Sequence, residues 1–169
     1  MFLLMLRCGL RVEEVSNLRL AAIDFKRRRI LIQHGKGAKD RVVCASNDAL
    51  KALVDYLKVR PSSRARKLFL VEKGSYRGKP ISVRGIKKRI EYYAKKHGLK
   101  VSCHQLRHTF GRHLVEAGMR VTSIQQLMGH SRIRTTQIYL HISDRQVQDD
   151  YDAAMVEIDR RLLLGGGAQ

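Results

Sequence analysis

The chain has 169 residues, 44% of them hydrophobic, and a formal net charge of +19. This length suits one domain with a real core, and the composition argues against disorder. No apolar run approaches the roughly 20 residues that cross a bilayer, and the apolar N-terminus lacks the basic start and cleavage site of a signal peptide. Three cysteines, an odd number without CxxC spacing, suggest neither a disulfide framework nor a zinc site and favour a reducing cytosol.

The positive charge is distributed unevenly. Residues 144–169 hold six of the 15 acids and three of the 34 bases, so the basic excess lies in residues 1–143. A compact domain this basic repels itself unless it faces a polyanion, which favours nucleic acid as the partner. A merely soluble basic surface and an anionic membrane are the alternatives.

The first part of the chain predicts two short helices, a β-hairpin and a longer helix. Gly9 suits the left-handed residue that ends a helix, and Ser46 suits a helix N-cap. The apolar spacing of the longer helix places Leu50, Leu53, Val54 and Leu57 on one face. The expected elements are helices at 1–8 and 11–19, strands at 27–33 and 41–45 around a basic tip at 34–40, and a helix at 47–59.

The second part predicts a buried run followed by helices only. Ser102 and Gln105 have the spacing of a capping box. The last helix is amphipathic, with a stripe of Val147, Tyr151, Met155, Ile158 and Leu162. The expected elements are the buried run 67–71 and helices at about 83–97, 103–118, 121–128 and 132–140 and from 144 onward. The predicted fold class is therefore mainly α with one small antiparallel β-hairpin or sheet.

Four segments concentrate side chains that can do chemistry. Each has an ordinary explanation when taken alone: an arginine paired with Glu14, a solvated hairpin tip, a structural or capping histidine, a half-buried tyrosine. The GKGAK stretch lacks the spacing of a nucleotide-binding loop and lies between strands. The candidates are Arg11 in CGLRVEEV, Lys36 in HGKGAKDR, His104 and Arg107 in HQLRH, His130 in LMGHS, and Tyr139.

Together these side chains suit the cleavage of a phosphodiester without a metal. The acids of residues 1–143 are scattered singly apart from Glu13 and Glu14, whereas a Mg²⁺ site needs grouped carboxylates. Two arginines can clamp the non-bridging oxygens of one phosphate, and histidines can donate or move protons. A lysine can protonate the leaving oxygen. A tyrosine, with an ordinary pKa of about 10, can attack phosphorus if nearby cations assist.

The ordered set GLRxxE, GKGxKxR, HxLRHTF, LMGHS and TTQxY resembles the tyrosine recombinase family, which includes phage integrases and Xer-type resolvases. The resemblance runs from about residue 3 to about residue 143. It implies the tyrosine recombinase catalytic-domain fold. It also implies that DNA strands are cut and rejoined through a 3′-phosphotyrosine, without metal, ATP or another cofactor.

The resemblance also implies a role for each matching residue. Arg11 and Arg107 would grip the scissile phosphate, and His104 would be the base near the tyrosine. His130 would hydrogen-bond a phosphate oxygen, Lys36 would protonate the 5′ oxygen, and Tyr139 would form the covalent link. Glu14 would support Arg11. The side chains expected to contact DNA are Lys39, Arg41, Lys87 and Lys88.

The same resemblance suggests a domain plan and partners. Residues 1–143 would form the catalytic domain and residues 144–169 an amphipathic helix and tail, while the family's N-terminal DNA-binding domain is absent from these residues. The partners would be double-stranded DNA, other copies of the chain in a tetramer, and accessory proteins. The tail would dock either on a neighbouring protomer or on its own domain. The expected location is the cytoplasm of a prokaryotic cell or a phage-infected host.

Three other functions compete with recombination. A DNA-binding relative without catalytic activity would explain why these residues lack the family's N-terminal domain. A type IB topoisomerase-like nicking enzyme would use closely similar chemistry, and an RNA-binding protein would explain the charge. The order and wording of the motifs favour the recombinase.

Overall fold

A computed structural model of the chain describes residues 1–33, 40–129 and 144–165. The helix expected at 132–140 lies outside these residues. The observed elements are α1 Phe2–Cys8, α2 Val12–Asn17, the 3₁₀ helix η1 Leu20–Ala22, β1 Ile23–Asp24, β2 Arg29–Ile32, β3 Arg41–Cys44, α3 Asn47–Val59, α4 Val83–Lys96, α5 Cys103–Glu116, α6 Val121–Met128 and α7 Asp144–Gly165. The predicted class, mainly α with a small antiparallel sheet, is confirmed.

The three strands form one antiparallel sheet in the order β1-β2-β3. Ile30 at the centre of β2 lies opposite Ile23 on β1 and Val43 on β3. Ile30 and Ile32 are buried, whereas Leu31 between them is partly exposed, so one face of the sheet faces the core. The predicted hairpin is confirmed, and the two-residue strand β1 is an addition to it.

The helices begin and end where local chemistry favours it. Gly9 ends α1 with a φ of 66°, in the left-handed region, and the hydroxyl of Ser82 at the start of α4 accepts a 3.1 Å hydrogen bond from the N–H of Gly85. The capping box of α5 is confirmed, because the N–H of Ser102 donates to Gln105 Oε1 at 2.7 Å and the N–H of Gln105 donates to Ser102 Oγ at 3.3 Å. The helix frame therefore follows from short-range signals.

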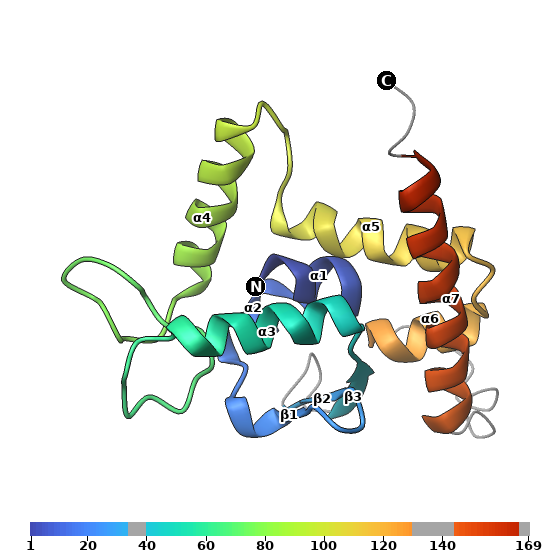
Figure 1. Cartoon of the computed structure of the whole chain (residues 1–169), viewed down its shortest axis with the longest axis horizontal. Coiled ribbons are helices and arrows are strands. Elements are labelled where there is room, and N and C mark those ends of the chain that lie inside the picture. Colours follow the sequence, from blue (N-terminus) through green and yellow to red (C-terminus); the bar gives the residue numbers. More distant parts are fainter. Residues whose placement is uncertain (34–39, 130–143, 166–169) are drawn as a thin grey trace.

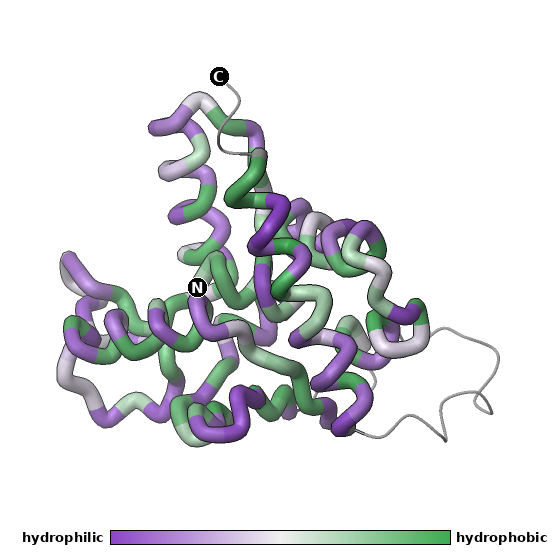
Figure 2. Tube along the Cα trace, turned by 45° about the vertical axis from the view of Figure 1, so that its right-hand side comes forward, coloured by the Kyte–Doolittle hydropathy of each residue, from purple (hydrophilic) through white to green (hydrophobic). Residues whose placement is uncertain are grey.

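Two clusters of buried side chains form the core. One joins α1, the sheet, α3 and α4, and the other lies among α5, α6 and α7. In Figure 1, α4 and α7 stand at opposite ends of the molecule and α5 runs between them, above α1 and α3. Figure 2 shows hydrophobic and hydrophilic residues alternating along the helices, as amphipathic helices require. On α3, Leu50 and Leu53 are buried as predicted, but Val54 is 43% exposed and its predicted burial was wrong.

The last helix packs on its own domain. Four residues of the predicted stripe are buried, namely Val147, Tyr151, Met155 and Ile158. Leu162 is 56% exposed, so its predicted burial was wrong; Figure 1 shows α7 continuing beyond α5.

Acidic side chains of α7 pair with basic groups of the domain body: Asp159 with Arg7 and Asp152 with Arg28. The acidic charge of the tail thus meets the basic charge of the body.

Among the described residues, no helix has both the length and the apolar composition needed to cross a membrane.

Candidate active site

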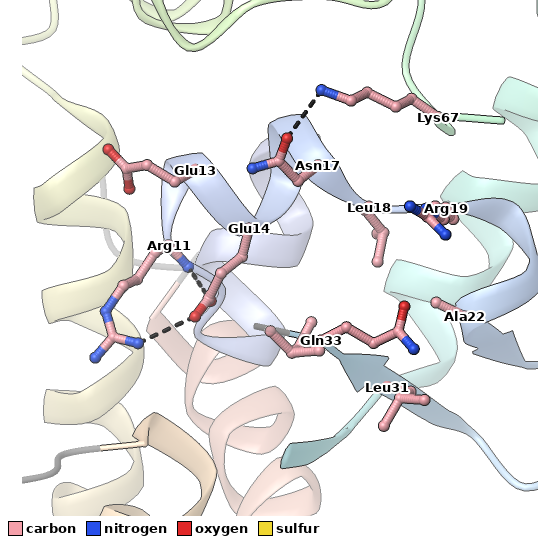
Figure 3. A pocket seen from close by; sticks show the side chains of 11 residues that line it. Arg11, Glu13, Glu14, Asn17, Leu18, Arg19, Ala22, Leu31, Gln33 and Lys67 are labelled. Carbon is pink, nitrogen blue, oxygen red and sulfur yellow. Dashed lines mark hydrogen bonds and ion pairs between the residues drawn. The ribbon is translucent and has the colours of Figure 1, made fainter. Parts of the chain in front are cut away.

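Arg11 lies at the junction of three elements. It is the N-cap residue of α2, directly after the turn that ends α1. Its backbone N–H donates to Glu14 Oε2 at 2.7 Å and its Nη1 donates to Glu14 Oε1 at 3.0 Å, as Figure 3 shows. Its Nη2 donates to the carbonyl of Gly129, just after α6, at 3.1 Å. These bonds fix the guanidinium while leaving the side chain 25% exposed.

Arg107 is buried on α5, and its guanidinium points to the junction of α1 and α6 where Arg11 also lies. Its Nη1 donates to the carbonyl of Gly9 and its Nη2 donates to the carbonyl of Met128 at 2.5 Å. Burial, with the positive charge of Arg11 next in effect, lowers the pKa of Arg107 to about 10. The shift arises mainly because burial removes water from the guanidinium, and a bound anion would stabilise its cationic form.

The two arginines line one cavity with His104. The cavity measures about 470 Å³ and lies between α2, α4 and α5. His104 stands one turn before Arg107 on α5, and Lys87 enters from α4. Two acids, Glu13 and Glu91, also line the cavity. The structure therefore brings together Arg11, His104 and Arg107, the three described members of the sequence signature.

A second cavity, of about 420 Å³, is also lined by Arg11 and is drawn in Figure 3. It is lined by parts of α2, η1 and β2, and Lys67 reaches it from the segment after α3 and donates to Asn17. Neither His104 nor Arg107 lines it. An anion there would meet only one of the two signature arginines, so the candidate phosphate site is the cavity beside α5.

Glu14 is the shared counter-ion of two arginines. Its side chain is 8% exposed, and its Oε1 accepts from Nη1 of both Arg11 and Arg41. Burial alone would raise the pKa of Glu14, but hydrogen bonds and charges from Arg41 and Arg11 outweigh burial and lower it below its ordinary value. Glu14 thus binds two guanidinium groups directly, those of Arg11 and Arg41, and its negative charge also acts on Arg107.

Arg41, which the sequence predicts to contact DNA, is largely buried and paired with protein groups. Its side chain is only 12% exposed. Its guanidinium binds both oxygens of Glu14, at 2.7 and 2.9 Å, and its Nε donates to the carbonyl of Leu127 at 3.2 Å. These partners turn Arg41 inward. Lys87 and Lys88, by contrast, are exposed on α4.

Four predicted residues lie outside the described part of the chain: Lys36, Lys39, His130 and Tyr139. Gly129, the residue before His130, has a left-handed φ of 58° and gives its carbonyl to Arg11. Within residues 1–33, 40–129 and 144–165, no three His, Cys, Asp or Glu side chains gather as metal ligands would.

The phage integrase family model matches residues 1–146. The chain belongs to the phage integrase family. Among its relatives, the tyrosine recombinase XerA of Pyrococcus horikoshii is 35% identical over 165 residues, which cover 97% of this chain and 56% of the relative. The tyrosine recombinase XerC of Actinobacillus succinogenes is 36% identical over 164 residues, which cover 94% of this chain and 53% of the relative.

The fold agrees with this family. The crystal structure of XerA recombinase superposes with a TM-score of 0.70 at 33% identity, covering 88% of this chain and 54% of that one. The chain thus spans about half the length of the relatives it matches. The predicted family and catalytic-domain fold are confirmed.

Proposed function

We propose that this chain is the catalytic domain of a site-specific DNA recombinase that cuts and rejoins strands through a 3′-phosphotyrosine at Tyr139. The observation that carries the proposal is the convergence of Arg11 and Arg107 beside His104. Two planar guanidinium groups can bind both non-bridging oxygens of one phosphate, and their charge persists at neutral pH. The names of the relatives, tyrosine recombinases, support the same activity.

The first step breaks one bond and forms another. The phenolate oxygen of Tyr139 attacks phosphorus, the bond from phosphorus to the 5′ oxygen breaks, and Lys36 gives that oxygen a proton. His104 takes the proton of the phenol, and His130 donates a hydrogen bond to a phosphate oxygen. The roles of Lys36, His130 and Tyr139 rest on the family resemblance of their motifs.

Electrostatic stabilisation is the largest contribution of the described residues. Charge that develops on the phosphate oxygens in the transition state meets guanidinium groups already held by carbonyl and carboxylate partners, so little reorganisation is needed. The covalent intermediate keeps the energy of the broken bond. Attack by a 5′-hydroxyl then rejoins the strand and releases Tyr139 without ATP or metal.

The surrounding surface suits duplex DNA. Lys87 lines the cavity, and both Lys87 and Lys88 are exposed on α4. We propose that they contact the phosphate backbone without reading sequence, as Lys39 would from the hairpin. We propose that the active assembly is a tetramer on DNA, assisted by accessory proteins where the element requires them. Residues 1–143 would supply the chemistry and residues 144–169 the helix that completes the domain. The reaction would take place in the cytoplasm of a prokaryotic cell or an infected host.

A covalent-capture experiment tests the proposal. The full chain is incubated with a pool of nicked duplexes whose sequence around the nick is randomised, so that the short fragment released by cleavage diffuses away and cannot be rejoined. A slow-migrating protein–DNA adduct on a denaturing gel is expected from the wild type and is expected to be absent from Tyr139→Phe. Tyr76→Phe is the matched control, because Tyr76 is 66% exposed in a loop.

Two results would count against the proposal. An adduct that survives in Tyr139→Phe would assign the nucleophile elsewhere. DNA binding by the wild type without any adduct would favour a binding module that has no catalytic role.

A further inference from the structure

Three arginines converge on the C-terminal end of α6. The carbonyl of Leu127 accepts from Arg41, that of Met128 from Arg107 and that of Gly129 from Arg11. The last carbonyls of a helix have no partner within the helix and carry the negative end of its dipole. Three consecutive carbonyls of this kind therefore form a docking point for cations from β3, α5 and the start of α2.

The side chain of Arg41 lies close against this turn. A Cβ added at Gly129 would lie 2.9 Å from Arg41 Cδ and 3.0 Å from its Nε, so only glycine leaves room for the side chain to lie against the turn. The helix α6 also packs against β3, which begins at Arg41. Arg41, at the start of β3, thus packs directly against the C-terminal end of α6.

The other end of Arg41 holds Glu14. Both carboxylate oxygens of Glu14 accept from Arg41, at 2.7 and 2.9 Å, in the two-point geometry that a planar guanidinium favours. Glu14 in turn receives two bonds from Arg11. A continuous path of contacts therefore runs from the end of α6 through Arg41 and Glu14 to Arg11, and Arg11 closes the loop on Gly129.

We propose that Arg41 is a positioning residue for the strand-cleavage reaction. It holds Glu14, and through Glu14 the side chain of Arg11, in a fixed place beside the C-terminal turn of α6. The inference rests on the proposed function. An internal role is favoured over a DNA contact because the Arg41 side chain is only 12% exposed and its Nε and both terminal nitrogens have protein partners. Its removal takes away two of the four hydrogen bonds that Glu14 accepts, so Glu14 and the guanidinium of Arg11 are held less firmly beside the phosphate.

The test separates the rate of cleavage from DNA binding. Single-turnover adduct formation at saturating nicked duplex gives the rate, and fluorescence anisotropy at two salt concentrations gives the dissociation constant. For Arg41→Gln we expect a cleavage rate lower by on the order of 10- to 100-fold with a dissociation constant within about twofold of wild type. Arg41→Lys keeps the charge but lacks the planar fork, so it is expected to be almost as slow.

Two variants provide the comparison. Lys58→Gln removes one exposed positive charge on α3 and is expected to leave the rate unchanged. Lys88→Gln removes a charge proposed to contact DNA, and it shows how a backbone contact behaves, with weaker binding and a shallower salt dependence.

A double-mutant cycle tests whether the effect passes through Glu14. If it does, Arg41→Gln combined with Glu14→Gln is about as slow as the slower single variant, because both changes interrupt the same path. Rescue of Arg41→Ala by free guanidinium ion, but not by a methylammonium ion, is a further expected result that global destabilisation would not produce. Circular dichroism of each variant checks that the fold is retained.

The outcomes distinguish this inference from the proposed function. A wild-type adduct together with an unchanged rate in Arg41→Gln and Arg41→Lys would overturn the positioning role and leave recombination standing. An unchanged rate with weaker binding would make Arg41 a DNA contact. A wild type that binds DNA without forming an adduct would overturn the proposed function and the positioning role with it.

Discussion

Replacing Gly9 with alanine tests how the end of α1 is seated against α5. Gly9 has a φ of 66°, and a Cβ at this position would lie 2.5 Å from both Cδ1 and Cε1 of the Phe110 ring. Side chains do not pack at that distance, so the buried ring must move. The carbonyl of Gly9 also accepts a hydrogen bond from Arg107, which means that the displacement reaches the candidate active site.

The expected loss of stability has two parts. A left-handed backbone costs alanine about 1 kcal/mol relative to glycine. Overpacking a well-filled core costs roughly another 1–3 kcal/mol. We therefore expect Gly9→Ala to lower the free energy of unfolding by about 2–4 kcal/mol, and Tm to fall by about 2–4 °C for each kcal/mol.

Gly98→Ala is the matched control for this experiment. Gly98 has nearly the same φ, 65°, but a Cβ there has no atom within 4 Å, so only the backbone cost of about 1 kcal/mol applies. Urea unfolding followed by circular dichroism measures both variants against wild type. If the two variants lose the same free energy of unfolding, the end of α1 does not pack closely on Phe110. The described hydrogen bond between Arg107 and the carbonyl of Gly9 would then be refuted as well.

Three further predictions concern the rest of the structure. Tyr151→Phe removes a buried hydroxyl that donates to the carbonyl of Arg7 at 2.7 Å. Urea unfolding should therefore show a free energy of unfolding lower by about 1–2 kcal/mol, and an unchanged value would mean that α7 packs elsewhere. The pKa of Glu14 in the folded protein lies below its unfolded value of about 4.3, so its contribution to stability is present above that pH and disappears as the pH falls through the folded pKa. The gap in urea midpoint between wild type and Glu14→Gln should therefore be wide at pH 7 and narrow toward pH 3, whereas a constant gap would contradict the ion pairs. Lys87→Gln and Lys88→Gln should each raise the dissociation constant for DNA and reduce the salt slope by up to about 0.9, and unchanged slopes would move the DNA path away from α4.

Features with local causes were predictable from the sequence. Gly9, Ser102 and Gly129 mark helix ends because capping depends on a few neighbouring atoms, and the structure has helix boundaries at all three. The two-residue strand β1 was missed because it is too short to show alternation. The exposed fractions of Val54 and Leu162 depend on how far neighbouring helices extend, and an apolar stripe does not record that distance.

Three of the predicted catalytic residues lie in the described part of the chain and near one another, but the contacts that hold them could not be predicted. Motif order identified Arg11, His104 and Arg107, and the fold brings them to one cavity. The inward direction of Arg41 has no local signal, because a basic residue after a basic hairpin tip has the same spacing whether it faces DNA or the core. Its partners on α2 and α6 come from distant parts of the chain and meet only when the domain packs.

The identity of the nucleophile is the central claim, and peptide mapping of the trapped adduct tests it most directly. Trypsin is expected to release residues 135–145, TTQIYLHISDR, in which Tyr139 is the only tyrosine. Mass spectrometry after nuclease digestion should find a nucleotide linked through its 3′-phosphate to that peptide at Tyr139. A nucleotide attached to another residue, or linked through a 5′-phosphate, would contradict the account.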